Sequence, residues 1–109
     1  RQFTRISFAM YAAHTYRYKP PYVLVRTLMN TKDPDKAFSE TSTYIEFWCP
    51  PNSGQYVVCG LSAELISDGD SFNITYKTTE APYFVLNKVK DSGYRVVGVS
   101  SVGETCVWT

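Results

Sequence analysis

The sequence has few of the residues on which catalytic and metal sites usually depend. Its 109 residues include one histidine, His14, and three cysteines, Cys49, Cys59 and Cys106. The cysteines are ten and 47 positions apart, without the close ligand pairs of structural zinc sites, and their odd number leaves at least one unpaired within the chain. The six glycines are dispersed and no Gly-x-Ser-x-Gly occurs, which excludes a glycine-rich phosphate loop and an α/β-hydrolase elbow. We therefore predict no metal and no cofactor.

Long apolar runs are also missing. No stretch approaches the roughly 18 consecutive apolar residues of a membrane helix, so we expect no membrane contact. No signal-peptide pattern is present, although a mature chain would have lost one. The odd cysteine count and the glycosylation sequon Asn73-Ile74-Thr75 favour a secreted protein.

Aromatic residues, in contrast, are abundant. They make up 16% of the chain, with nine tyrosines, and hydrophobic residues make up 44%. A tyrosine packs its ring and keeps its hydroxyl in water, which is typical of half-buried strand positions. The chain is long enough to bury one hydrophobic core, and we predict a single monomeric domain over residues 1–109.

The net charge is only +1, but the charges are unevenly distributed. Residues 1–36 carry a net +5 and residues 37–80 a net −5. Such halves form either a bipolar surface, whose basic side contacts RNA or another anion, or faces that complement each other within one fold. Aromatic rings beside bases can stack on single-stranded RNA, although core filling explains the rings equally well. The candidate RNA contacts are Tyr16, Arg17, Tyr18 and Lys19.

Several stretches have the pattern of β-strands. Phe3–Met10 alternates between apolar and polar residues, as a half-buried strand does. Near the C-terminus, valine and aromatic residues form three short runs separated by Gly, Asp and Ser, a pattern typical of an antiparallel meander. These runs are Tyr83–Asn87, Tyr94–Ser100 and Thr105–Trp108, with a turn expected at Ser101–Glu104.

Residues 22–30 have two interpretations. Pro21 suits the first turn of a helix, and Tyr22, Val25 and Met29 would then share one helical face. The valines favour a strand instead. We predict a short helix.

The middle of the chain is predicted to be β-structure. Thr43–Cys49 and Gln55–Leu61 flank the turn-forming residues 50–54 and indicate a hairpin, and Phe72–Tyr76 alternates as a further strand. The predicted fold class is therefore α+β, with one short N-terminal helix packed on an antiparallel meander sheet.

Four segments near the C-terminus indicate a family: Tyr83-Phe-Val-Leu-Asn-Lys, Ser92-Gly-Tyr-Arg-Val-Val, Val99-Ser-Ser-Val-Gly and Thr105-Cys-Val. They resemble the end of the small secreted RNase-like effectors of powdery mildew fungi, which are built on the fungal guanyl-specific ribonuclease fold. The resemblance covers residues 62–109 and implies a ribonuclease T1-like fold, secretion by the fungus and delivery into plant cells. In that family, the cysteine matched by Cys106 bridges to one near the N-terminus, where this chain has Tyr18.

The resemblance also implies a fold without ribonuclease chemistry. Guanyl-specific ribonucleases use a carboxylate base, an arginine that stabilises the phosphorane and a histidine that protonates the leaving oxygen. The matching positions hold Ser62, Tyr83 and Ser101, none of which can perform these roles. Glu64 lies two residues from the base position, but no histidine follows His14. We therefore expect a pseudo-ribonuclease and no enzymatic activity.

The expected function is that of a virulence effector that binds host plant proteins and is detected by an intracellular immune receptor. Two alternatives remain: an active ribonuclease that uses His14 with Glu46 or Glu64, and a non-catalytic RNA-binding protein. A small barrel for apolar ligands is a further alternative, although the chain is short for one.

Function in such an effector would reside in surface loops displayed by a rigid sheet. A sheet face with Tyr44, Phe47 or Trp48 is a second candidate surface. The candidate interaction residues in the loops are Lys32, Asp33, Asp35, Lys36, Asn52, Asp68 and Asp70.

Overall fold

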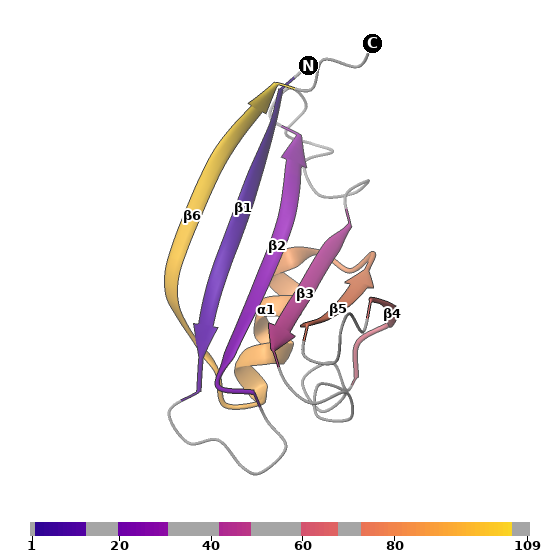
Figure 1. Ribbon diagram of the computed structural model, residues 1–109, viewed down its shortest axis with the longest axis vertical. Coiled ribbons are helices and arrows are strands. Elements are labelled where there is room, and N and C mark those ends of the chain that lie inside the picture. The colour runs from indigo at the N-terminus through magenta and orange to yellow at the C-terminus, as the bar shows by residue number, and fades with distance from the viewer. Residues whose placement is uncertain (1, 13–19, 31–41, 49–59, 68–72, 106–109) are drawn as a thin grey trace.

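The computed structural model describes residues 2–12, 20–30, 42–48, 60–67 and 73–105. Within these ranges, six strands form one sheet and a single helix lies against one of its faces (Figure 1). In chain order the elements are β1 (Gln2–Tyr11), β2 (Tyr22–Asn30), β3 (Thr43–Trp48), β4 (Ala63–Ser67), β5 (Asn73–Thr78), α1 (Pro82–Asp91) and β6 (Arg95–Thr105).

The sheet is antiparallel throughout, with the strand order β4-β5-β3-β2-β1-β6. Strand β5 is second from one edge, whereas β6 forms the opposite edge, and α1 connects the two. The helix therefore crosses behind the middle of the sheet (Figure 1). This crossing distinguishes a covered face from an open face.

The hydrophobic core lies between α1 and the covered face. Alternate residues of each strand point to one side of a sheet, so in β2 Val23, Val25 and Thr27 are buried while Tyr22 is 64% exposed. The helix contributes two valines to the same core. The buried hydrophobic residues of this core are Met10, Ala12, Val23, Val25, Ile45, Phe47, Ile74, Val85, Val89 and Tyr94.

Helix α1 has clear local causes. Pro82 occupies the first turn, where its missing N–H costs no hydrogen bond and its fixed φ suits a helix. Val85 and Val89 are four residues apart and both face the core. The helix ends just before Gly93, whose φ of 98° few other residues adopt without strain. The described part of the chain contains no helix long and apolar enough to cross a membrane.

A hydrogen bond joins the end of this helical unit to the start of the sheet. The Tyr94 hydroxyl, buried between α1 and β6, donates to the carbonyl of Pro20. The Ala12 N–H donates to the carbonyl of Pro21, the residue that follows Pro20, at 3.0 Å. The chain entering β2 is thus fixed both to the end of β1 and to the segment after α1.

Three buried threonines form a row across the covered face. Thr27, Thr43 and Thr78 are neighbours on β2, β3 and β5. The Thr43 hydroxyl donates to the carbonyl of Glu80 at 3.0 Å, and the Thr78 hydroxyl donates to the carbonyl of Ser62 at 2.8 Å and accepts the Glu80 N–H at 3.1 Å. Two of the threonines thereby anchor the segment between β5 and α1. The Thr27 hydroxyl has no hydrogen-bond partner among the described residues.

The predicted ribonuclease T1-like α+β fold with an N-terminal helix is wrong. Residues 22–30 form strand β2, because their period of two, and not their helical spacing, matches the burial: Val25 is buried, while Tyr22, its supposed neighbour on a helical face, is exposed. Residues 83–87, predicted as a strand, lie in α1, since Val85 and Val89 meet the core only at helical spacing. The turn expected at Ser101–Glu104 is also wrong, because β6 continues through it, paired with β1.

Other predicted strands are confirmed. Phe3–Met10 lies within β1, Thr43–Cys49 corresponds to β3, Phe72–Tyr76 to β5 and Tyr94–Ser100 to the first part of β6. The predicted hairpin of Thr43–Cys49 with Gln55–Leu61 is wrong, because β3 pairs with β2 on one side and with β5 on the other and so has no free edge. Residues 49–59 themselves lie outside the described residues.

The core assignment predicts unequal effects of removing two aromatic rings. We expect Phe47→Ala, at a fully buried site, to lower the free energy of unfolding by about 3–5 kcal/mol. Tyr83→Ala, at a site 69% exposed, should change it by less than about 0.5 kcal/mol. Urea denaturation of both variants tests this, and equal losses would contradict the burial of Phe47.

The threonine row predicts opposite signs for one substitution at two equally buried sites. Thr78→Val removes two hydrogen bonds and should lower the free energy of unfolding by about 1–3 kcal/mol. Thr27→Val replaces a hydroxyl that has no described partner and should raise it by about 1 kcal/mol. Thermal or urea unfolding measures both, and a loss at Thr27 as large as at Thr78 would show that the Thr27 hydroxyl is bonded.

Candidate functional site on the open face of the sheet

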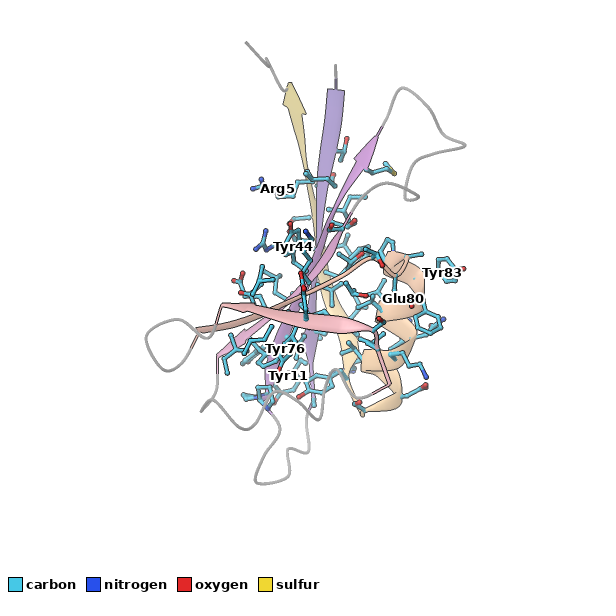
Figure 2. The ribbon with its side chains drawn as sticks, turned by 90° about the vertical axis from the view of Figure 1, so that its right-hand side faces the viewer. Arg5, Tyr11, Tyr44, Tyr76, Glu80 and Tyr83 are labelled. Atoms are coloured by element: carbon cyan, nitrogen blue, oxygen red, sulfur yellow. The ribbon has the colours of Figure 1, made fainter. Side chains whose placement is uncertain are left out.

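No described helix or strand lies over the second face of the sheet. Figure 2 shows Arg5 and Tyr44 on the side of the sheet away from α1, which carries Tyr83 on the other side. The side chains of this open face alternate with the core residues along each strand. The open face therefore offers a surface whose side chains are not needed for the core.

Strand pairing arranges the open face in rows that grade from small to large side chains. Two such rows lie side by side, and each runs from β6 to β5. Small residues stand on β6 and β1, and larger ones stand on β2 and β3, so the surface is shallowest near β6. The first row is Gly98, Ala9, Leu24, Glu46 and Thr75, and the second is Ser100, Ser7, Arg26, Tyr44 and Lys77.

Arg26 links these two rows. Its Nη2 atom lies 3.2 Å from Oε2 of Glu46, and its Cζ atom lies 5.0 Å from the centre of the Tyr44 ring. The guanidinium is therefore held by an ion pair on one side and a cation–π contact on another. Both charged side chains remain partly exposed, so solvent screens the pair.

A hollow of about 340 Å³ lies on the side of Arg26 toward the start of β2, and we term it the lower hollow. Its accessible side chains are those of Ala9, Pro21, Tyr22, Leu24 and Glu46; the other lining residues, Met10, Val23 and Phe47, have their side chains buried on the covered face. The lining is mostly apolar, and its one charged group is the Glu46 carboxylate. At one end of the hollow, the Tyr22 ring packs against the Tyr11 ring, with ring centres 4.9 Å apart.

A second hollow, of about 320 Å³, lies on the side of Arg26 toward the end of β2, and we term it the upper hollow. Arg5, Arg26 and Tyr44 line it together with Leu28 and Thr27. Its lining thus carries positive charge and no carboxylate, the reverse of the lower hollow. Each hollow is at the small end of the range for ligand sites in proteins.

This arrangement is suited to binding. Among the described residues, no three His, Cys, Asp or Glu side chains gather closely enough to hold a metal ion. Around the two hollows, the described residues of the open face place the Glu46 carboxylate, the guanidinium groups of Arg5 and Arg26, and aromatic rings.

The structure places the three supposed remnants of a ribonuclease site far apart. Ser62 precedes β4 at one edge of the sheet, and Ser101 lies in β6 at the opposite edge. Tyr83 is on the first turn of α1. Glu46 and Glu64 both lie on the open face, on strands separated by β5.

The remaining predicted site residues lie outside the described residues: the loop residues Lys32, Asp33, Asp35, Lys36, Asn52, Asp68 and Asp70, the candidate RNA contacts Tyr16, Arg17, Tyr18 and Lys19, and His14.

The sequence reasoning missed the cluster of Arg26, Tyr44 and Glu46, although it named a sheet face with Tyr44 as a candidate surface. The signal was present as the polar half of an alternating pattern, with Arg26 between buried Val25 and Thr27. Reading residues 22–30 as a helix removed that signal.

Comparison with known proteins shows the family of this chain. The family model of the GTP cyclohydrolase I feedback regulatory protein (GFRP) matches residues 52–109, more than half of the chain. This chain belongs to the GFRP family. It is similar to the GTP cyclohydrolase 1 feedback regulatory proteins of Xenopus laevis and Xenopus tropicalis, with 42% identity to each over 53 residues. The alignment covers 44% of this chain and 62% of each frog protein, so the chain spans less than two thirds of these relatives. No solved structure shows a significant match.

Membership of the GFRP family corrects the earlier identification. The resemblance to RNase-like effectors of powdery mildew fungi is wrong, because the same C-terminal segments match the GFRP family instead. The expected virulence effector in plant immunity is wrong for the same reason, and so are the two alternatives, a ribonuclease and an RNA-binding protein. The localisation that the resemblance implied loses its basis as well.

The GFRP match divides the fold in an informative way. Of the described elements, β4, β5, α1 and β6 lie within residues 52–109, and β1, β2 and β3 lie outside them. The matched strands stand at both sides of the sheet, and the three unmatched strands stand between them. The matched part therefore forms a continuous sheet only with the first half of the chain, which also supplies both hollows.

The partial exposure of the Arg26–Glu46 pair predicts a small contribution to stability. In a double-mutant cycle of Arg26→Met and Glu46→Gln, we expect a coupling free energy of about 0.2–1 kcal/mol. The coupling should fall as salt is added, because salt screens exposed charges. Urea unfolding at low and high salt measures it, and a coupling of several kcal/mol would mean that the pair is desolvated.

Proposed function

We propose that this chain binds a GTP cyclohydrolase I and adjusts its activity as a feedback regulator, without catalysing a reaction itself. The observation that supports this proposal is the GFRP family match over residues 52–109, together with the regulatory role stated in the names of the frog relatives. The partner would therefore be a protein, as expected from the sequence, but an enzyme and not a component of plant immunity.

We place the contact with the enzyme on the first turn of α1. This helix lies within the matched residues, and its outer side exposes Tyr83 at 69% and Phe84 at 36%. Lys88, one turn later, holds its Nζ atom 5.6 Å from the centre of the Phe84 ring. Exposed aromatic side chains on a rigid element, with a cation beside them, are the type of surface in which binding hot spots occur.

The first test is direct. Purified chain is titrated onto immobilised GTP cyclohydrolase I from the same organism, and the rate of GTP turnover is measured with and without the chain. We expect a complex and a change in the enzyme's rate. A chain that neither binds the enzyme nor alters its rate at high micromolar concentration would refute the proposed function.

The second test concerns the position of the contact. Tyr83→Ala should weaken binding by about tenfold or more, because it removes an aromatic anchor without disturbing the core. Val97→Ala, on β6 at 52% exposure, is the matched control within the same family segment and should bind like the wild type. If Tyr83→Ala also binds like the wild type, the contact is not on α1, although the regulatory function stands.

A further inference from the structure

The lower hollow is separate from the proposed enzyme contact on α1. Among the described residues, its accessible side chains come from β1, from β2 and the residue before it, and from β3, which all lie outside the residues matched by the GFRP family. Its strand side chains Ala9, Leu24 and Glu46 alternate with core residues, so the hollow also lies on the opposite face of the sheet from α1. Any ligand of this hollow is therefore a feature of this chain's own N-terminal half.

We propose that the lower hollow binds a small organic cation, with an apolar body and N–H donors, and that Glu46 is its counter-ion. The charge of the lining determines the sign of the ligand. Glu46 lines the lower hollow and Arg26 does not, since the guanidinium lines the upper hollow instead. An anion in the lower hollow would face the Glu46 carboxylate, whereas Arg26, the base paired with that carboxylate, lines the upper hollow.

The ion pair leaves part of Glu46 available. Arg26 contacts Oε2, and within the described ranges Oε1 has no hydrogen-bond partner. The contact of Arg26 with Tyr44 holds the guanidinium on the upper side of the carboxylate. A ligand N–H can therefore donate to Glu46 without displacing Arg26, and a charged donor makes the stronger bond.

The rest of the lining suits an apolar body. Leu24 and Ala9 form the middle of the row, and Gly98 beyond Ala9 adds no side chain that would close the hollow. Tyr22, with Tyr11 against it, presents an exposed ring at one end of the hollow, and an aromatic face attracts a cation. A volume of about 340 Å³ fits a ligand of fragment size.

Benzamidine is a suitable probe, because it joins a planar apolar ring to a cationic amidinium with several N–H donors. Binding to the isolated, full chain is followed by calorimetry or by chemical shifts of the residues around the hollow. We expect a dissociation constant on the order of 1 mM, as for other fragments. Benzoate, of the same shape and opposite charge, should not bind at ten times that concentration.

Three variants test the position. Glu46→Gln keeps the shape of the side chain but removes its charge, and should weaken benzamidine binding by about tenfold or more. Ala9→Met fills the hollow from its floor and should abolish binding even if Glu46→Gln proves unstable. Glu64→Gln makes the same change on the open face away from the hollow and should bind benzamidine like the wild type.

The proposal is overturned if benzamidine does not bind the wild type, if benzoate binds as tightly, or if neither Glu46→Gln nor Ala9→Met weakens binding. None of these results bears on GTP cyclohydrolase binding, which is measured separately and involves the opposite face.

Discussion

The packing of α1 against one face of the sheet is the constraint from which the other features follow. Strand β5 lies near one edge of the sheet and β6 forms the other, so the connection must cross the sheet. It does so as a helix that buries Val85 and Val89 against β2 and its neighbours, and burial of such side chains stabilises a fold by about 1.5–3 kcal/mol each. Because only one helix is present among the described residues, only one face is covered.

The two faces then have different chemistry for a physical reason. On the covered face, polar groups must be hydrogen-bonded, and the threonines of the row meet this demand at Thr43 and Thr78 by anchoring the chain before α1. On the open face, water satisfies polar groups, so charged residues such as Arg26 and Glu46 are tolerated beside apolar ones. The GFRP family segment supplies the helix and the sheet edges, and the N-terminal half supplies the central strands and the hollows.

The C-terminal third identified the wrong family because its short apolar segments were interpreted as strands. Tyr83-Phe-Val-Leu-Asn-Lys contains β-formers, yet Pro82 at the first helical position and the spacing of Val85 and Val89 are helix signals. Once this segment was taken as a strand, a meander and a ribonuclease-like fold followed. The segment was informative about the family, as the GFRP match over residues 52–109 shows, but its secondary structure had been assigned incorrectly.

Sequence alone indicated β1 and β5 from their alternation, and β3 and the first part of β6 from runs of aromatic and β-branched residues, because both patterns are local properties of the chain. The predictions of a helix for residues 22–30 and of a strand for residues 83–87 were both wrong, since both stretches follow a proline and contain valines, and these local signals conflict. Only the tertiary structure decided: residues 22–30 pair on both sides within the sheet, whereas residues 82–91 bury two valines across it. The candidate site depends on the same decision, because strand pairing alone brings Arg26 to Glu46, 20 residues away in the sequence.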